Sequence, residues 1–510
     1  MKKIFSIIAV VGTLGLLMPA CSLDKFPTDR VVLENAFETF LDAERFNNGL
    51  YSELRRSHHS VATTTTEIMS DLFNAHANFG NRGGFPHRLN TELAGGYEVR
   101  DIWGNVFASI FQVNHFLDNI GNVSGLTTAQ EATAADFIAE AHYMRAFFYT
   151  LLAGHYMYPM TTANRNTPEL GLPLITTADI QIRAGRSTIG ETFDLILSDI
   201  EAAKNVSRVG VPGAIRVSQD AVNALAARVH FMMGNNTLAA QYANAVIATG
   251  RYPLITTESA LRAMWREDVS TENIFALHVT TTAFGTAAMG AGANFNDPGT
   301  TSTWTSNPAH LGAVFTRVNT TVGGYDPDFI PTQTVIDLYD ANDIRLNVFF
   351  SNPAEDDLVV GTSAFSGIRV LYKFRGNRNF TVNHLQAPIV HRIAEMYLIA
   401  AEAEQNLARL NELRVARGLT ALGAWNEQEL RDEWVREFIG EGFRIQGLRR
   451  WGIGFNGRVP QNPATVANYG STEFTNRNVT PDQFFFFTLP IPSDELRNNP
   501  NMRQTPSWDF

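Results

Sequence analysis

A helical repeat of side chains is the feature of this sequence that most restricts its fold. Between about residues 131 and 155 the pattern advances in steps of three and four, through Phe137, Ala141, Met144, Phe148, Leu151 and His155. Residues at this spacing lie on one face of an α-helix and form a mostly apolar stripe. The sequence therefore predicts a long amphipathic helix in this region.

A second region, residues 218–250, predicts two helices joined as a hairpin. Ser218 is suited to cap the first helix, whose apolar face carries Val222, Leu225, Val229 and Met232. The turn Gly234-Asn235-Asn236 ends this pattern, and Gly250 is suited to end the helix that follows. Alanines let two helices approach closely, as in tetratricopeptide-type pairs. The segment carries Ala221, Ala224, Ala226, Ala227, Ala239, Ala240, Ala243, Ala245 and Ala248.

Further helices are predicted at about residues 388–406 and 427–450, with two loop-rich stretches between the helical regions. The longer stretch, about residues 271–376, is rich in Gly, Thr, Asn and Phe, and short strands are predicted at residues 274–279 and 368–374. The other, about residues 71–100, mixes glycines with aromatic residues. Long stretches without a helical period are usually functional or disordered.

The first twenty residues have the order of a secretory signal peptide: Met1-Lys2-Lys3, an apolar run from Ile4 to Met18, then Pro19-Ala20. Cys21, the single cysteine, follows directly and is expected to be a lipid attachment site. The alternative is an ordinary secreted protein with one free thiol, which an oxidising compartment disfavours. No later apolar stretch is long enough to cross a bilayer, so we expect a soluble chain held by its anchor.

Charge and motifs exclude several classes of function. The net charge of -11 and the absence of a basic run argue against nucleic acid as a partner. The chain has no Walker loop, no His-Glu-x-x-His, no Gly-x-Ser-x-Gly and no set of cysteine ligands, so no enzyme activity and no cofactor is expected. His58-His59, His76 and His87 fit no metal-site spacing, and scattered surface histidines are expected instead. Hydrolysis by two carboxylates stays open, because linear spacing does not reveal such a pair.

Five segments carry a resemblance to a known family, in that family's order. They are Leu23-Asp24-Lys25-Phe26-Pro27; Trp103 with Asn114, Leu117 and Ile120; Glu140-Ala141-His142-Tyr143-Met144-Arg145-Ala146-Phe147-Phe148-Tyr149 before Tyr158-Pro159; residues 392–403 with 410–418; and residues 437–451 with Leu489-Pro490-Ile491-Pro492 and 495–502. Together they resemble the SusD/RagB family, lipoproteins of the Gram-negative outer membrane that pair with SusC-like TonB-dependent transporters in glycan uptake. Gly447, Thr505 and Ser507 depart from the family pattern at structural positions.

The resemblance implies a mainly α fold: a tetratricopeptide-like scaffold of helical pairs (an α-α superhelix) with irregular loop and short-strand insertions. We expect a single domain over residues 21–510, with the scaffold at about 30–255 and 388–452. The ligand-binding insertions are expected at about 71–100 and 271–376, and an extended tail at 453–510. Arg392, Glu395 and Glu402 share one polar helix face and are expected to pair across helices as scaffold.

Sugar binding without chemistry needs aromatic faces flanked by polar side chains, and both insertions supply them. The candidates are Phe73, Asn78, Phe79, Arg82, Phe85 and Tyr97 in the first insertion, and Phe284, Phe295, Asn296, Asp297 and Trp304 in the second. For any single Phe, packing of the loop onto the helices is the favoured alternative. For Trp304, among Thr, Ser and Asn, binding is favoured, whereas Trp103 is expected in the core.

The function implied is that of a glycan-binding lipoprotein at the exterior of the outer membrane, which passes oligosaccharide to a SusC-like transporter. Partners are then a glycan, the transporter and, through Cys21, the membrane. The same scaffold with a peptide or another nutrient as cargo is the main alternative. A secreted hydrolase and a purely structural envelope protein are further alternatives, with no sequence feature in their favour.

Overall fold

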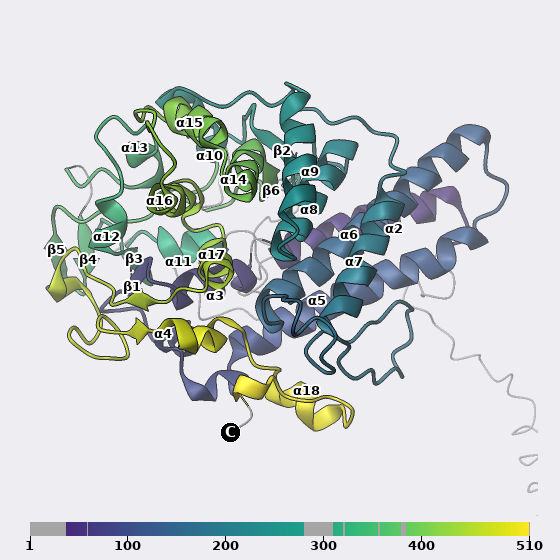
Figure 1. The fold of residues 1–510 in the computed structure, drawn as a ribbon, viewed down its shortest axis with the longest axis horizontal. Coiled ribbons are helices and arrows are strands. Elements are labelled where there is room, and N and C mark those ends of the chain that lie inside the picture. Colours follow the sequence, from purple (N-terminus) through teal and green to yellow (C-terminus); the bar gives the residue numbers. More distant parts are fainter. Residues whose placement is uncertain are drawn as a thin grey trace, which may run out of the picture.

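The computed structural model describes residues 37–508, apart from residues 59, 280–309, 320–321, 355–356 and 379–383. Long helices fill one side of the molecule, and short strands, short helices and loops fill the other (Figure 1). The mainly α fold predicted from the sequence is confirmed. None of the helices among these residues is both long and apolar enough to cross a bilayer.

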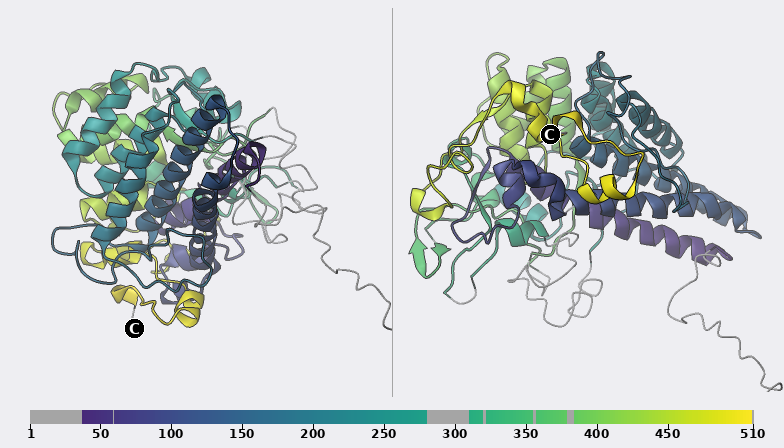
Figure 2. Two further views of the ribbon diagram at one scale, coloured as in Figure 1. Left: turned by 90° about the vertical axis from the view of Figure 1, so that its right-hand side faces the viewer. Right: turned by 90° about the horizontal axis from the view of Figure 1, so that it is seen from below.

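The long helices are α2 (Phe40–His58), α5 (Tyr97–Asn119), α6 (Thr128–Tyr156) and α7 (Ile189–Ala203). Helix α6 packs against the other three, and two perpendicular views show α2, α5 and α6 running side by side (Figure 2). A capping box begins α6, because Thr127 and Gln130 each accept a hydrogen bond from the other's backbone N–H. The predicted stripe of α6 is buried apart from Leu151, which is half-buried.

The predicted helical hairpin is also present, as α8 (Gln219–Met232) and α9 (Asn236–Ala248). Ser218 Oγ accepts a hydrogen bond from the Ala221 N–H at 3.3 Å and caps α8. Gly250 lies just beyond α9 in the left-handed region, with φ +65°. Helix α14 (Ile393–Glu404) packs against both, so the alanine-rich faces meet as in a tetratricopeptide-like scaffold.

The other half of the molecule is built from short elements. Its helices are α3 (Val61–Met69), α4 (Gly84–Arg88), α10 (Glu258–Arg266), α11 (His310–Phe315), α12 (Gln333–Ile336), α13 (Leu346–Phe349), α15 (Leu407–Ala416), α16 (Glu427–Phe438), α17 (Arg444–Trp451) and α18 (Ser493–Asn498). Its strands are β1 (Phe73–Ala75), β2 (Asn273–Ala276), β3 (Phe329–Pro331), β4 (Leu358–Val360), β5 (Ser363–Phe365), β6 (Ile389–Arg392), β7 (Phe455–Asn456) and β8 (Asn478–Val479). They pair antiparallel as β1 with β3, β2 with β6, β4 with β5 and β7 with β8.

The pairing of β1 with β3 brings the two loop insertions together. Phe73 lies opposite Pro331, and Ala75 lies opposite Phe329. A strand of residues 71–100 is thereby joined to a strand of residues 271–376, more than 250 residues later in the chain. Both insertions therefore contribute to the same side of the molecule, at the left of Figure 1.

Three predicted elements were wrong in detail. The helix predicted at 388–406 begins later, because residues 389–392 form β6 and pair with β2. The helix predicted at 427–450 is two helices, since Gly440 and Gly442 between them have φ of +82° and +88°. The strand predicted at 368–374 is absent among the described elements apart from a single bridge from Leu371 to Phe350. The tail contains β7, β8 and α18 as well as extended segments.

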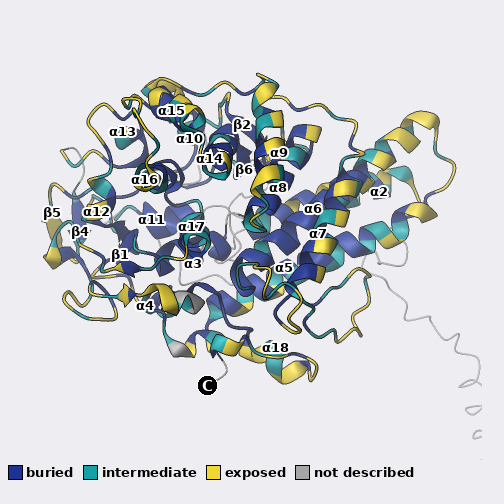
Figure 3. Ribbon diagram, viewed as in Figure 1, coloured by how far each residue is buried: buried dark blue, intermediate teal, exposed yellow. Residues whose placement is uncertain are grey.

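Two large groups of buried apolar side chains lie under these halves. Buried residues, dark blue in Figure 3, occur in both halves. One joins the long helices to α8, α9 and α14. The other lies beneath the short elements, where Trp265, Phe315 and Phe349 are almost fully buried. Polar pairing across helices, as expected for Glu395 and Glu402, is confirmed: Arg228 binds Glu395 and Arg450 binds Glu402, each at 2.6 Å.

Candidate functional site

Two of the predicted aromatic contacts in the first insertion belong to the core. Phe73 is fully buried (0% exposed) and stacks on Phe315 with ring centroids 4.6 Å apart. Phe79 is 8% exposed and meets Phe329 and Phe474 edge to face. Neither ring has a face for a ligand, because β1 and the turn after it are covered by the second insertion. The packing alternative is correct for both residues.

The other predicted residues of this insertion reach the surface to different degrees. Asn78 is exposed, while Arg82, Phe85 and Tyr97 are half-buried. The Tyr97 hydroxyl accepts a hydrogen bond from the Gly83 N–H at 3.2 Å, and Phe85 packs against the larger core. The second set, Phe284, Phe295, Asn296, Asp297 and Trp304, lies outside the described residues, as does Cys21. Trp103 is 5% exposed, which confirms its expected place in the core.

Arg82 belongs to a network of charges that the sequence did not reveal. It binds the buried Asp328 through two nitrogens, at 2.5 and 2.9 Å. Arg317 contacts Asp328 at 3.2 Å and Asp326 at 3.8 Å, and His76 Nδ1 lies 3.4 Å from Asp326. The network ties the turn after β1 to the segment that leads into β3, so it fixes both insertions at one place.

Beside this network lies a second group of four residues: Arg266, Tyr325, Tyr372 and Arg375. Tyr372 is half-buried, and the guanidinium carbons of Arg266 and Arg375 lie 5.2 and 5.1 Å from its ring centroid. Tyr325 meets Tyr372 edge to face, and its hydroxyl accepts a hydrogen bond from Arg375 Nη1 at 2.5 Å. We call these residues and Asp326 the loop face; it combines planar groups with hydrogen-bond donors and acceptors.

The histidines considered as metal ligands differ from expectation in position. His76 and His87 are fully buried, so the prediction of surface histidines was wrong for these two. Burial, reinforced by Arg317, lowers the pKa of His76 to about 4, so its imidazole is neutral at pH 7. Within the described residues, no three side chains of His, Cys, Asp or Glu are grouped as ligands for a metal ion.

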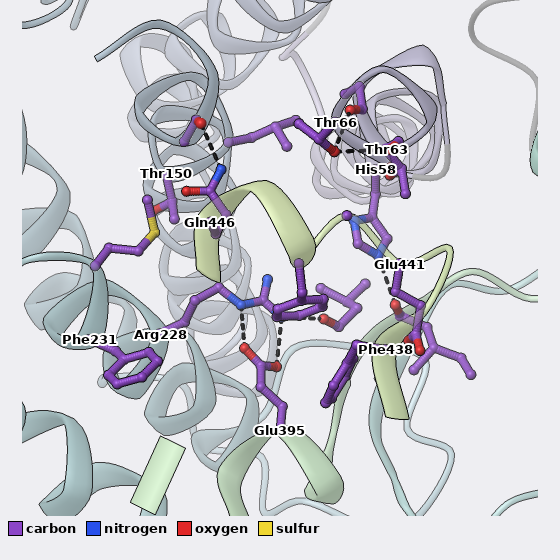
Figure 4. Close-up of a pocket in the computed structure, with 18 of the residues that line it drawn as sticks. His58, Thr63, Thr66, Thr150, Arg228, Phe231, Glu395, Phe438, Glu441 and Gln446 are labelled. Carbon is purple, nitrogen blue, oxygen red and sulfur yellow. Dashed lines mark hydrogen bonds and ion pairs between the residues drawn. The ribbon is translucent and has the colours of Figure 1, made fainter. Parts of the chain in front are cut away.

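A cavity of about 120 Å³ lies deeper in the molecule, between α3, α6, α8, α14, α16 and α17 (Figure 4). Its wall carries the rings of Phe147, Phe231, Trp434, Phe438 and Phe443 and the hydroxyls of Thr63, Thr66 and Thr150. Ordinary ligand pockets have volumes of roughly 300–1,000 Å³, so this cavity suits several waters or one small ring rather than an oligosaccharide. None of the predicted site residues that the structure describes lines it.

The ionic groups of this cavity are paired with one another. Arg228 holds Glu395 by two hydrogen bonds, at 2.6 and 2.7 Å (Figure 4). Arg392 binds Glu441 at 2.7 Å. Burial would raise the pKa of Glu395, but Arg228 outweighs it and lowers that pKa to about 2. Burial would also raise the pKa of Glu441, but Arg392 and Lys373 outweigh it and lower that pKa. Both carboxylates are therefore ionised at neutral pH and cannot serve as general acids.

Burial raises the pKa of several carboxyl groups, and it brings those of Glu67 and Glu98, which are both enclosed, toward neutrality. Burial raises the pKa of Glu67 to about 7, and its oxygens accept hydrogen bonds from the N–H groups of Gly440 and Gly442. Burial raises the pKa of Glu98 to about 6 beside a cavity of about 20 Å³, which also touches Arg82 and Tyr97. A sugar ring does not fit in so small a space. Neither group is placed to protonate a glycosidic oxygen.

Comparison with known proteins assigns the fold and the family. A model described as the SusD family matches residues 346–508, and a model described as "Starch-binding associating with outer membrane" matches residues 23–231. Together they span well over half of the chain. The chain belongs to the SusD family, as the sequence segments had indicated.

Individual relatives agree with this assignment. The starch-binding protein SusD of Bacteroides thetaiotaomicron is 32% identical over 130 residues, which cover 23% of this chain and 21% of that protein. The match thus spans about a fifth of that relative's length. A SusD superfamily structure from Bacteroides thetaiotaomicron has a TM-score of 0.72 at 20% identity, covering 92% of this chain and 100% of the other. Surface glycan-binding protein A from Bacteroides fluxus has a TM-score of 0.67 at 17% identity, covering 92% and 99%.

Proposed function

We propose that this protein binds oligosaccharides at the loop face and releases them unaltered. The observation that carries the proposal is the pairing of β1 with β3, which brings both insertions to the side where Tyr372, Arg375 and Asp326 are partly exposed. Planar side chains beside donors and acceptors match a sugar, which has an apolar face and a rim of hydroxyls. The names of two similar proteins, a starch-binding protein and a surface glycan-binding protein, support the same ligand class.

Binding without turnover is supported by the state of the carboxyl groups. Asp326 is the more accessible acid of the charge network, with 22% of its side chain exposed. Its neighbour Asp328 is fully buried and held by Arg82 and Arg317. A glycosidase needs two carboxyl groups that both reach the scissile bond. Asp328 does not reach a ligand, so this pair is suited to hold the loops rather than to cleave.

Isothermal titration calorimetry against a panel of neutral and acidic polysaccharides tests the proposal, with Tyr372→Ala as the variant. Removing the ring on which both guanidinium groups rest is expected to weaken glycan binding roughly tenfold or more, about 1.4 kcal/mol. Tyr242→Ala is the matched control, since Tyr242 is a half-buried tyrosine on α9 that stacks on His230 in the helical half. Silence across the panel, together with clear binding of peptides, would show that the cargo is of another class.

We further propose that the protein is attached to the outer membrane by a lipid on Cys21, faces the exterior, and passes its ligand to a SusC-like TonB-dependent transporter. The signal-like residues before Cys21 support the anchor. The description of the matching family as associating with the outer membrane supports the location. A tether beside the transporter keeps the binding site at a high effective concentration near the channel.

Cys21→Ala is expected to shift the protein from the membrane fraction to the soluble fraction, without loss of ligand binding. The reason is that acylation needs the thiol, whereas the loop face is formed by residues far along the chain. Fractionation followed by immunoblotting, with glycan titration of the released protein, measures both effects. Ser22→Ala is the control and should stay at the membrane; retention of the Cys21 variant there would place the anchor elsewhere.

A further inference from the structure

Two arginines of the loop face, Arg266 and Arg375, are paired with no acid in the part of the chain that the structure describes. Among the residues that the structure describes, the Arg266 side chain donates no hydrogen bond, and its buried Nη1 atom is unsatisfied. Arg375 donates one hydrogen bond, to the neutral hydroxyl of Tyr325. By contrast, Arg262, one turn earlier on the same helix α10, is paired with Glu258 at 2.6 Å. The pair thus includes guanidinium N–H groups that no described residue accepts.

Three acids of this region, among the residues that the structure describes, are engaged by other groups. Asp328 is bound by Arg82 and Arg317, and Glu267, next to Arg266 in sequence, is paired with Arg378. Asp268 accepts hydrogen bonds from the Asn377 side chain and the Ala387 N–H. These three carboxylates are therefore not paired with the two arginines, and the described ion contacts of Asp326, the acid of the loop face, are to His76 and Arg317.

Keeping two such cations close together costs folding free energy. Both rest on one ring, that of Tyr372, and burial lowers the pKa of Arg266, with repulsion from Arg375 acting in the same direction. Attraction to the ring offsets part of this cost, since the face of an aromatic ring attracts a cation. A like-charged pair without a counter-charge is the kind of local conflict that folded proteins tolerate at functional sites.

We infer that the ligand of the loop face is an anionic glycan, whose carboxylate or sulfate group binds between Arg266 and Arg375. This inference rests on the proposed function and specifies its ligand class. Guanidinium groups match planar carboxylates and sulfate oxygens by paired, charge-assisted hydrogen bonds, roughly twice as strong as neutral ones. The hydroxyls of the same sugar would meet Asp326 and Tyr372, which are partly exposed beside the pair.

The test compares polymers that share a backbone and differ in charge. Calorimetry with the intact protein would use polygalacturonate against its carboxyl-reduced form, and dextran sulfate against dextran, which separates carboxylate from sulfate recognition. We expect at least one charged polymer to bind tenfold or more tighter than its neutral counterpart, and this preference to weaken as NaCl is raised. The double variant R266Q/R375Q should lose the preference, whereas R262Q should keep it, although it also removes one arginine charge.

The outcomes separate this inference from the proposed function. Equal binding of charged and neutral forms would overturn the inference and leave glycan binding in place. Binding of no glycan would overturn the proposed function itself. If R262Q reduces the preference for charged polymers as much as the double variant does, the preference comes from general surface charge and not from Arg266 and Arg375. If the double variant fails to fold, the comparison of charged with neutral polymer on the native protein still shows whether the ligand is an anionic glycan.

Discussion

Replacing Glu437 with alanine is expected to lower the free energy of unfolding by roughly 3–5 kcal/mol, the range for removing one partner of a buried ion pair. Glu437 is fully buried at the centre of a group of charges. Its oxygens contact Arg345 and Arg417, each at 2.8 Å, and also Arg392. Burial alone would raise the pKa of Glu437, but Arg417 and Arg392 outweigh it and hold that pKa well below its usual range.

The size of the effect follows from the arginines that Glu437 leaves behind. Arg345 also binds Asp343 and Glu433, and Arg417 also binds Glu272, so each keeps another acid. The substitution nevertheless removes one negative charge from among buried cations. A buried charge without compensation lowers the free energy of unfolding, because it has lost its hydration. Urea unfolding followed by tryptophan fluorescence measures the change.

A surface pair provides the control for this prediction. Glu427 and Arg431 lie one turn apart on α16, the helix that carries Glu437, and Glu427 is 53% exposed. Glu427→Ala is expected to change stability by at most about 0.5 kcal/mol. Equal losses in the two variants would mean that the buried network contributes no more than a surface ion pair.

Acid is expected to destabilise the protein through its buried histidines, and His384→Asn should reduce this sensitivity. Burial, reinforced by Arg375, lowers the pKa of His384 to about 4, and burial with Arg228 does the same for His391. The unfolded chain takes up these protons near pH 6.5, whereas the folded protein resists them until about pH 4. Stability is therefore full above pH 6.5 and is lost as the pH falls toward 4, by about 3 kcal/mol at most for each histidine.

Asparagine suits position 384 because the backbone there is left-handed, with φ +64°, a region that asparagine tolerates. Glu67 and Glu98 act in the opposite direction, since their pKa values are raised and the folded protein holds their protons longer. Both proteins contain Glu67 and Glu98, so comparing the variant with the native protein between pH 7 and 4 cancels the contribution of these two acids. The variant should lose less stability over that range, whereas His278→Gln, at an exposed residue, should follow the native curve. Parallel curves for all three proteins would refute the role of His384.

The helical scaffold was predictable because its information is local. The steps of three and four in α6, the Ser218 cap and Gly250 beyond α9 each act over one or two helical turns, and all are found in place. The break between α16 and α17 was less predictable. Gly440 and Gly442 permit a left-handed backbone, but the apolar pattern of the residues before and after them predicts one continuous helix.

The candidate site was predicted only as a region. Residues 71–100 and 271–376 do meet, yet Phe73 and Phe79 turn inward because the second insertion covers them. No sequence pattern marked Arg266, Tyr372 or Arg375 as site residues. Residues 368–374 resembled a strand, and Arg266 is the last residue of an ordinary helix. What sets the two arginines apart is that no acid among the described residues is paired with them, and that depends on the whole arrangement of the chain.

The long helices and their caps thus follow from the sequence alone, because backbone propensity and apolar period act between near neighbours. The family and its loop insertions were indicated by the resemblance of five segments. The tertiary structure alone decided which aromatic rings are buried and which charges are paired. Both depend on contacts between residues far apart in the chain, such as Arg82 with Asp328 and Arg417 with Glu272. How strongly a charge interacts, and whether an aromatic ring packs in the core or stays open to a ligand, depend on burial and on neighbouring groups. Both are set only when the chain folds.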